Sequence, residues 1–271
     1  MSSASAWRFE TVDGLTLARC GLLSAVPGIA HAFSTRQADG ARDFDLGRAG
    51  EDVPPWSDRR ERFSDAAGIE GPGPVILLQV HGARILCSTD FRGGATPRAD
   101  GVLALRDDGE RRAPAVRIAD CVPVLIADRQ ARAVAAVHAG WRGTARGIAR
   151  RAVRELAELG LDPAHLVAAV GPAIGPCCYE VDEEVLEGVS TACGRAGEDL
   201  AARGASGRPM LDLRRANRIQ LENGGLPPGA ISCAPWCTFC EEARFFSYRR
   251  EGEGTGRMMA CVGWCAPGAS P

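Results

Sequence analysis

The segment from Ala119 to Gly143 constrains the fold more than any other part of this chain. Two apolar runs, Val122 to Ala127 and Ala133 to Val137, flank a short polar segment, which is typical of a β-hairpin. Cys121 and His138 lie at nearly equal distances from the midpoint of this hairpin. Antiparallel pairing then predicts that they face one another on one side of the sheet, about 5 Å apart at Cβ. A register slip of one residue would turn them to opposite faces.

A thiolate and an imidazole at this distance suit one zinc ion, provided that a third ligand comes from elsewhere in the chain. His81 is the candidate, because it follows the apolar run Val75 to Val80, a predicted strand, and because the chain has only 4 histidines. Three protein ligands with an open fourth position are typical of catalytic zinc. Taken on its own, His81 would more often be a hydrogen-bonded core histidine.

The sequence after His138 predicts a helix beside this metal centre. Apolar residues recur at helical spacing between Ile148 and Leu159, with Thr144 as the expected N-cap and Gly160 as the C-terminal stop. Two glycines at a helix start leave backbone N–H groups accessible, and Arg142 beside them would suit an anion such as phosphate. The alternative is an ordinary strand–turn–helix junction, where glycine pairs are common.

The charge balance argues against nucleic acid and anionic membranes as partners. The chain of 271 residues has 32 basic and 34 acidic residues and a formal net charge of −2. Every basic residue is arginine, which excludes lysine-based Schiff-base and P-loop chemistry. The N-terminal segment lacks the pattern of a signal peptide, and no apolar run is long enough to span a membrane, so we expect a cytoplasmic protein.

The 11 cysteines are scattered along the chain, which favours buried thiols and metal ligands over a disulfide framework. The segment from Trp236 to Cys240 resembles a thioredoxin-type redox motif, but a strand-like segment, Arg244 to Tyr248, follows where that motif would open a helix. Structural zinc is a second interpretation, although the spacing matches no zinc ribbon well. It would draw on Cys233, Cys237, Cys240, Cys261 and Cys265.

The remaining segments predict strands, helices and loops without a domain boundary, so we expect one domain over residues 1–271. A strand ending near Arg36 leads into a polar loop that is suited to substrate contacts. The Gly- and Pro-rich segment from Gly171 to Val181 is a shaped loop that carries Glu180. Helices are predicted over Pro54 to Ala67, Glu183 to Val189 and Leu213 to Leu221, the last capped by Asp212.

Several motifs together closely resemble the laccase-domain or polyphenol-oxidase-like family, also called YfiH-like, and the resemblance runs from His31 to Val262. They are QVHG at 79–82, ADC at 119–121, HAGWRG at 138–143, GPAIGPCCYEV at 171–181, LDLRRANRIQL at 211–221, and FFSYRR with TGR at 245–257. Members of that family are regarded as purine nucleoside phosphorylases with adenosine deaminase side activity. Its metal ligands map onto His81, Cys121 and His138.

The resemblance implies an α+β fold of mixed β-sheets flanked by helices, related to a group once described as cysteine hydrolases. It implies zinc as the metal, with copper as the alternative, and phosphorolysis of adenosine, inosine, guanosine and methylthioadenosine. Asp120 would serve proton transfers beside the metal ligand Cys121. Phosphate would be bound by arginines, for which Arg36, Arg142 and Arg249 are the candidates.

Two further residues concern the nucleoside. Glu180 is the candidate for a ribose hydroxyl, and Asp45 stands where the family has asparagine, which bears on substrate preference. Two other functions remain open, namely copper-dependent polyphenol oxidation and a metal-binding, peptidoglycan-related accessory role without nucleoside turnover. Copper oxidation requires several copper ions close together, for which 4 histidines are few. The partners are then a purine nucleoside and phosphate, and a monomer is the default expectation.

Overall fold

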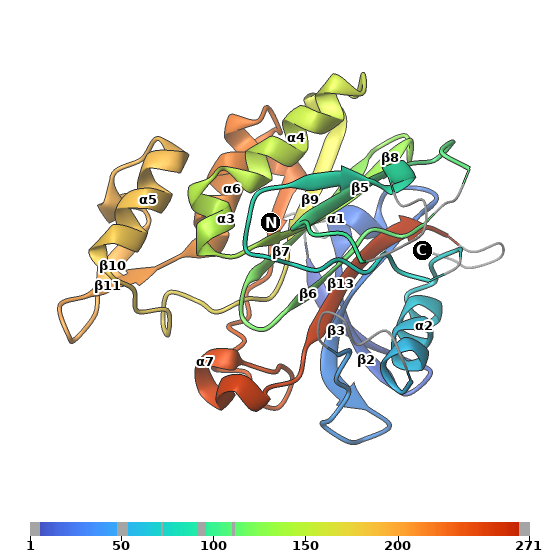
Figure 1. Ribbon diagram of the computed structural model, residues 1–271, viewed down its shortest axis with the longest axis horizontal. Coiled ribbons are helices and arrows are strands. Elements are labelled where there is room, and N and C mark those ends of the chain that lie inside the picture. The colour runs from blue at the N-terminus through green and yellow to red at the C-terminus, as the bar shows by residue number, and fades with distance from the viewer. Residues whose placement is uncertain (1–5, 48–53, 72, 91–95, 110–111, 266–271) are drawn as a thin grey trace.

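The computed structural model describes residues 6–47, 54–71, 73–90, 96–109 and 112–265, and the statements below concern these residues (Figure 1). The central hairpin belongs to a six-stranded sheet with the spatial order β12-β9-β7-β8-β5-β4. Two neighbouring pairs in it, β4 with β5 and β9 with β12, are parallel, while the other pairs are antiparallel. The strands are Ile85–Cys87 (β4), Gly101–Leu105 (β5), Val122–Asp128 (β7), Ala133–Ala139 (β8), Leu166–Val170 (β9) and Ile231–Cys233 (β12).

A second sheet of five antiparallel strands has the order β1-β2-β3-β13-β6, so the last strand of the chain lies between two earlier ones. A separate two-stranded hairpin is formed by β10 and β11. The strands are Trp7–Val12 (β1), Leu15–Cys20 (β2), Ile29–Ala38 (β3), Ala115–Ile118 (β6), Met258–Trp264 (β13), Ala201–Arg203 (β10) and Pro209–Leu211 (β11).

The side chains of β7 show how the layers pack. Val124 and Ile126 face the helices on one side of the six-stranded sheet, whereas Leu125 and Ala127 face the five-stranded sheet on the other. Because both faces are covered, every residue of this strand is buried, as expected for a continuous apolar run. A further helix covers the outer face of the five-stranded sheet, so the layers follow in the order helix, sheet, sheet, helix (Figure 1).

Most helices of the described segments lie over the six-stranded sheet. α2 packs on the outer face of the five-stranded sheet through residues such as Phe63, and α1 packs against β2 and β3 of that sheet through Leu23. Their bounds are Gly21–Ser24 (α1), Trp56–Ala66 (α2), Trp141–Ala145 (α3), Ile148–Glu158 (α4), Glu183–Cys193 (α5), Leu213–Asn223 (α6) and Tyr248–Glu251 (α7). The prediction of an α+β fold with mixed sheets flanked by helices is confirmed. Among the described helices, none is long and apolar enough to cross a membrane.

Three local predictions were wrong. The helix after His138 is split in two, because Gly147 adopts the left-handed conformation with φ at +73°, and Thr144 lies inside the short α3 instead of capping it. The run from Val75 to Val80 forms one isolated bridge, between Leu78 and Arg98, and no strand. The segment from Arg244 to Tyr248 leads into α7 without forming a strand.

Candidate metal centre and active-site cavity

The three predicted ligands come together at one end of the central hairpin. His81, Cys121 and His138 each offer one ligand atom, and these atoms all lie within 4.8 Å of one another. The register differs from the prediction by two residues, because His138 pairs with Pro123 and Cys121 lies beyond the end of the strand. A shift of two residues preserves the face, so the two side chains are diagonal neighbours instead of direct partners. We call this set of three residues the His/Cys centre.

Asp100, which the sequence analysis did not single out, forms hydrogen bonds that hold two residues of the His/Cys centre in position. It is fully buried just before β5, and its Oδ1 atom lies 2.9 Å from Nδ1 of His138. Its carboxylate also accepts the backbone N–H of His81 at 2.9 Å and that of Gly82 at 2.7 Å. Burial raises the pKa of Asp100, but these bonds outweigh it and hold the pKa below its usual value.

The bond to Asp100 also decides which nitrogen of His138 is available. With Nδ1 directed at the carboxylate, Nε2 faces Cys121 and His81 and is the atom left for a metal. His81 itself sits at φ +57°, a conformation that few side-chain-bearing residues adopt. The carboxylate therefore holds both the strained turn at His81 and the ring of His138 in place.

The electrostatics of the His/Cys centre favour a thiolate. Burial raises the pKa of Cys121, but the charges and hydrogen bonds of His138 and His81 outweigh it and lower the pKa to about 6. Burial lowers the pKa of His138, whereas Cys121 and Asp100 raise it to about 9. A thiolate beside a protonated imidazole is an arrangement in which a metal cation can replace the proton. Two imidazoles and one thiolate therefore fit zinc.

The two glycines of the HAGWRG motif let the backbone of α3 lie close to the metal ligands and to the turn at His81. A Cβ atom at Gly140 would lie 3.0 Å from Sγ of Cys121 and 3.2 Å from Cδ2 of His81, and one at Gly143 would lie 2.8 Å from the carbonyl oxygen of Gly82. Gly143 therefore has no room for a side chain where α3 lies against the turn at His81, and a side chain at Gly140 would crowd the ligands Cys121 and His81. Whether this helix start also binds an anion stays a prediction.

Two cavities meet at the His/Cys centre and share His81, Ala119, Cys121 and Arg257. The main cavity has a volume of about 530 Å³, and the adjoining cavity has a volume of about 200 Å³. Three aromatic residues line the main cavity, namely Trp141, Tyr179 and Tyr248, together with Asp120, Ile174, Leu213 and Arg249. The adjoining cavity is lined by Gln79, Arg117 and His138 in addition to the shared residues.

The carboxylate of Asp120 lies in the wall of the main cavity and is held by three donors. Its Oδ1 atom accepts the hydroxyl of Thr238 at 2.6 Å, and its Oδ2 atom accepts the hydroxyl of Ser247 at 3.0 Å and the backbone N–H of Arg249 at 2.9 Å. Asp120 therefore fixes the segment that carries Arg249, and its predicted part in proton transfer stays a prediction.

Of the other predicted substrate residues, some line the cavities and others do not. Arg249 lines the main cavity, with its guanidinium 5.3 Å from the centre of the Tyr179 ring. Asp45 does not line either cavity, but its Oδ1 atom accepts the backbone N–H of Arg257 at 2.7 Å, and its predicted part in substrate preference stays a prediction. Glu180 lies next to Tyr179 in sequence, but its carboxylate accepts the hydroxyl of Ser206 at 2.6 Å and does not line either cavity.

Arg36 and Arg142 also lie outside the described lining of both cavities. The guanidinium of Arg36 forms an ion pair with Glu251 at 2.8 Å, and that of Arg142 lies 4.4 Å from the centre of the Trp141 ring. Their predicted roles in phosphate binding stay predictions. The structure adds Arg257 and Tyr179 to the site, and both lie inside motifs that the sequence analysis identified without assigning them roles. Burial raises the pKa of Tyr179 to about 12.

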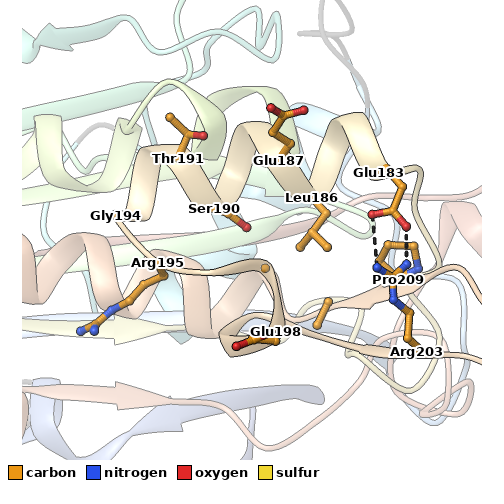
Figure 2. Close-up of a pocket in the computed structure, with 12 residues that line it drawn as sticks. Glu183, Leu186, Glu187, Ser190, Thr191, Gly194, Arg195, Glu198, Arg203 and Pro209 are labelled. Atoms are coloured by element: carbon orange, nitrogen blue, oxygen red, sulfur yellow. Dashed lines mark hydrogen bonds and ion pairs between the residues drawn. The ribbon is translucent and has the colours of Figure 1, made fainter.

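A remote cavity of about 820 Å³ lies between α5, the short helical turn after it and the β10–β11 hairpin (Figure 2). Leu186 lies on its α5 wall and the ion pair of Arg203 with Glu183 at its rim. Its described lining contains no histidine or cysteine and shares no residue with the two cavities at the His/Cys centre. We therefore assign the chemistry to the smaller cavities.

Asp100→Asn is expected to lower the zinc affinity of the His/Cys centre by about 10- to 100-fold, because a carboxylate that orients a ligand histidine contributes about that much. The change keeps the shape of the side chain but removes the charge that His138 and the backbone N–H groups face. Competition with a chromophoric chelator measures the affinity. Unchanged affinity with an unchanged fold, judged by circular dichroism, would mean that Asp100 does not support the metal.

The chain matches, over residues 30–265, the family described as multi-copper polyphenol oxidoreductase laccase. Purine nucleoside phosphorylase YlmD of Geobacillus stearothermophilus is 35% identical to it over 259 residues, which cover 90% of this chain and 93% of that protein. Adenosine deaminase RL5, from an unknown prokaryotic organism, is 33% identical over 259 residues, which cover 92% of this chain and 98% of that protein. The curated relatives thus include both activities that the motifs imply.

The same relationship is visible in three dimensions. The crystal structure of the hypothetical protein YfiH from Bacillus licheniformis superimposes with a TM-score of 0.82 at 29% identity and covers 95% of this chain and 98% of that one. The fold therefore matches along nearly the whole length of both chains. The layers of two sheets and their flanking helices are shared with this protein.

Proposed function

Because this chain belongs to the multi-copper polyphenol oxidoreductase laccase family, whose curated relatives include purine nucleoside phosphorylases, we propose that it is a zinc-dependent purine nucleoside phosphorylase. It cleaves adenosine with phosphate to adenine and ribose 1-phosphate, takes inosine, guanosine and methylthioadenosine as further substrates, and deaminates adenosine as a second activity. The observation that carries the proposal is the meeting of aromatic side chains, arginines and the His/Cys centre in one pair of cavities.

The main cavity supplies what a purine nucleoside needs. Its volume of about 530 Å³ falls in the usual range for small-molecule sites. In this proposal the purine lies against the rings of Trp141, Tyr179 and Tyr248, which offer flat apolar surfaces. The sugar then lies nearer to the His/Cys centre, where the two cavities meet.

Phosphate occupies the junction of the two cavities. Arg257 lines both cavities, Arg249 lines the main one and Arg117 the adjoining one, so positive charge surrounds the junction. Guanidinium groups bind phosphate through paired hydrogen bonds and hold the nucleophile in place. Cleavage of the N-glycosidic bond develops positive charge on the sugar, which the held anion stabilises. Ordering of phosphate beside the sugar is thus the main contribution of these arginines.

The departing base requires a proton. Asp120 lies in the cavity wall, and we retain it as the group that takes part in proton transfer. Tyr179 keeps its proton at neutral pH, because its pKa is about 12, and it is the second donor available to the base. His81, Cys121 and His138 would hold zinc, which would activate a water molecule for deamination.

Copper-dependent polyphenol oxidation, which the family description names, is the less favoured function. Of the 4 histidines, His31 is buried in the five-stranded sheet and accepts the backbone N–H of Cys20 at 2.9 Å, and His165 lies in a turn before β9. Burial also lowers the pKa of His31 to about 3. Two histidines therefore remain for the His/Cys centre, and a cluster of several copper ions needs more.

The proposed reaction predicts a difference between the two products of adenosine. Adenine and ribose 1-phosphate are expected only when phosphate is present, whereas inosine from deamination is expected with or without it. Chromatographic separation of the products after incubation with and without phosphate measures both. Equal release of adenine without phosphate would indicate hydrolysis instead. Absence of all products would favour the metal-binding accessory function.

A further inference from the structure

Four cysteines from two distant segments lie together outside the His/Cys centre. Two follow β9, and two follow β12, the neighbouring parallel strand. Chains that leave the same edge of a sheet from adjacent parallel strands run side by side, and here Ala173 continues the pairing with Cys237. The backbone N–H of Thr238 donates to the carbonyl oxygen of Ala173 at 3.1 Å. We call the set the four-thiol cluster, and its members are Cys177, Cys178, Cys237 and Cys240.

The sulfur positions fit one tetrahedral metal ion. All four Sγ atoms lie within 4.8 Å of one another. Sγ of Cys240 lies 3.6 Å from that of Cys177 and 3.4 Å from that of Cys178. Tetrahedral zinc with Zn–S bonds of about 2.3 Å separates its sulfurs by about 3.8 Å, so the cluster needs only small adjustments to receive the ion. An iron–sulfur cluster holds its cysteines farther apart, because inorganic sulfide lies between them.

Backbone donors surround one of these sulfurs. Sγ of Cys237 accepts the backbone N–H of Gly175 at 3.1 Å, which ties the loop after β9 to the loop after β12. The backbone N–H groups of Cys240 and Phe239 also donate to this sulfur. Donors of this kind suit a thiolate ligand, because they offset the negative charge that it brings. Two residues separate Cys237 from Cys240, which is the spacing of paired cysteine ligands in zinc knuckles.

We propose that the four-thiol cluster is a structural zinc site, separate from the His/Cys centre. Its four protein ligands close the coordination sphere, so its role is to join two loops and not to activate a substrate. The interpretation of a redox pair at Cys237 and Cys240 is then unnecessary, because both thiolates are ligands. The earlier assignment of Cys233, Cys261 and Cys265 to such a site does not apply, since the described cluster does not include them.

The site fixes a wall of the main cavity. Thr238, between two of the cysteines, donates its hydroxyl to Asp120 at 2.6 Å, and the backbone N–H of Ile174 donates to the carbonyl oxygen of Asp120 at 3.1 Å. Zinc in the four-thiol cluster therefore holds both loops that contact this residue. Loss of that zinc is expected to loosen the wall while leaving the His/Cys centre loaded.

Metal analysis of the whole protein tests the proposal. The protein is expected to contain about two zinc ions per chain, and Cys178→Ser combined with Cys240→Ser about one. Cys121→Ser alone is also expected to leave about one, and the three changes together none. Cys87→Ser is the matched control, because Cys87 is a partly buried thiol outside both clusters. It should retain both ions.

A second measurement keeps all four cysteines of the cluster, so it does not depend on whether the Cys178→Ser and Cys240→Ser variants fold. Cobalt loaded into Cys121→Ser is expected to give the tetrahedral d–d bands and intense thiolate-to-cobalt absorption of a site with four sulfur ligands. Several results would overturn the proposal. They are one zinc ion per chain that disappears with Cys121→Ser, iron instead of zinc, or an intact mass lower by two hydrogens that a reductant restores, which would indicate a disulfide.

Discussion

Cys121→Ser is expected to release zinc from the His/Cys centre and to lower both phosphorolysis and deamination of adenosine at least about 10³-fold. The change removes the only thiolate of this centre and leaves two imidazoles, which hold zinc far less tightly. A factor of 10³ corresponds to about 4 kcal/mol of transition-state stabilisation, which is in the range that a Lewis-acid metal supplies. Turnover with adenosine and zinc content of the same preparation measure the effect.

Cys87→Ser again serves as the control, because it removes a thiol at the end of β4 without touching the His/Cys centre. Its zinc content and both activities should equal those of the unchanged protein. Circular dichroism and thermal unfolding of Cys121→Ser establish that the variant is folded. If it loses its zinc and keeps both activities, the metal has no part in either reaction.

Arg257→Gln is expected to lower phosphorolysis about 100-fold and to change deamination much less. Arg257 lines both cavities at their junction, and its backbone N–H is fixed by Asp45. Removing one charged contact to the attacking phosphate raises the activation free energy by about 3 kcal/mol, which corresponds to about two powers of ten in rate. Deamination does not use phosphate, so a loss of adenine without a matching loss of inosine would assign Arg257 to phosphate binding. The rates at varied phosphate concentration, followed by chromatography, provide the measurement.

Arg142→Gln is the informative comparison, because the sequence favours Arg142 as a phosphate ligand whereas the structure places it against the ring of Trp141. We expect a smaller loss of phosphorolysis in this variant than in Arg257→Gln. The reverse order would restore the interpretation of the helix start as the phosphate site. Equal losses of both activities in Arg257→Gln would mean that this residue supports the cavity and not phosphate.

Local patterns predicted the parts of the structure that depend on neighbours in sequence. The cap of α6 is an example, since the side chain of Asp212 accepts the backbone N–H of Arg215 at 3.0 Å as its position before an apolar repeat suggests. The hairpin and the shared face of Cys121 and His138 followed from two apolar runs on either side of a short polar segment. The third ligand, His81, was found because histidines are rare in this chain.

What the sequence did not predict depends on contacts between distant segments. Asp100 lies in an ordinary Ala-Asp-Gly turn, and only the pairing of β5 with β8 brings it to His138. Cys177 and Cys178 meet Cys237 and Cys240 only because β9 and β12 are neighbours, and no local spacing contains that information. The split between α3 and α4 at Gly147 was missed because an isolated glycine is often tolerated within a helix.

The buried carboxylate of Asp100 also bears on how the His/Cys centre exchanges its metal. It holds the turn at His81 and the ring of His138 by bonds that do not involve the metal, so the His/Cys centre keeps its shape when empty. The four-thiol cluster joins two loops, and Cys177 and Cys240 in it are exposed. A chelator should therefore reach the cluster, as it should reach the exposed His81 of the His/Cys centre. After zinc removal, the His/Cys centre of the folded protein should bind zinc again rapidly, because its ligands stay in place.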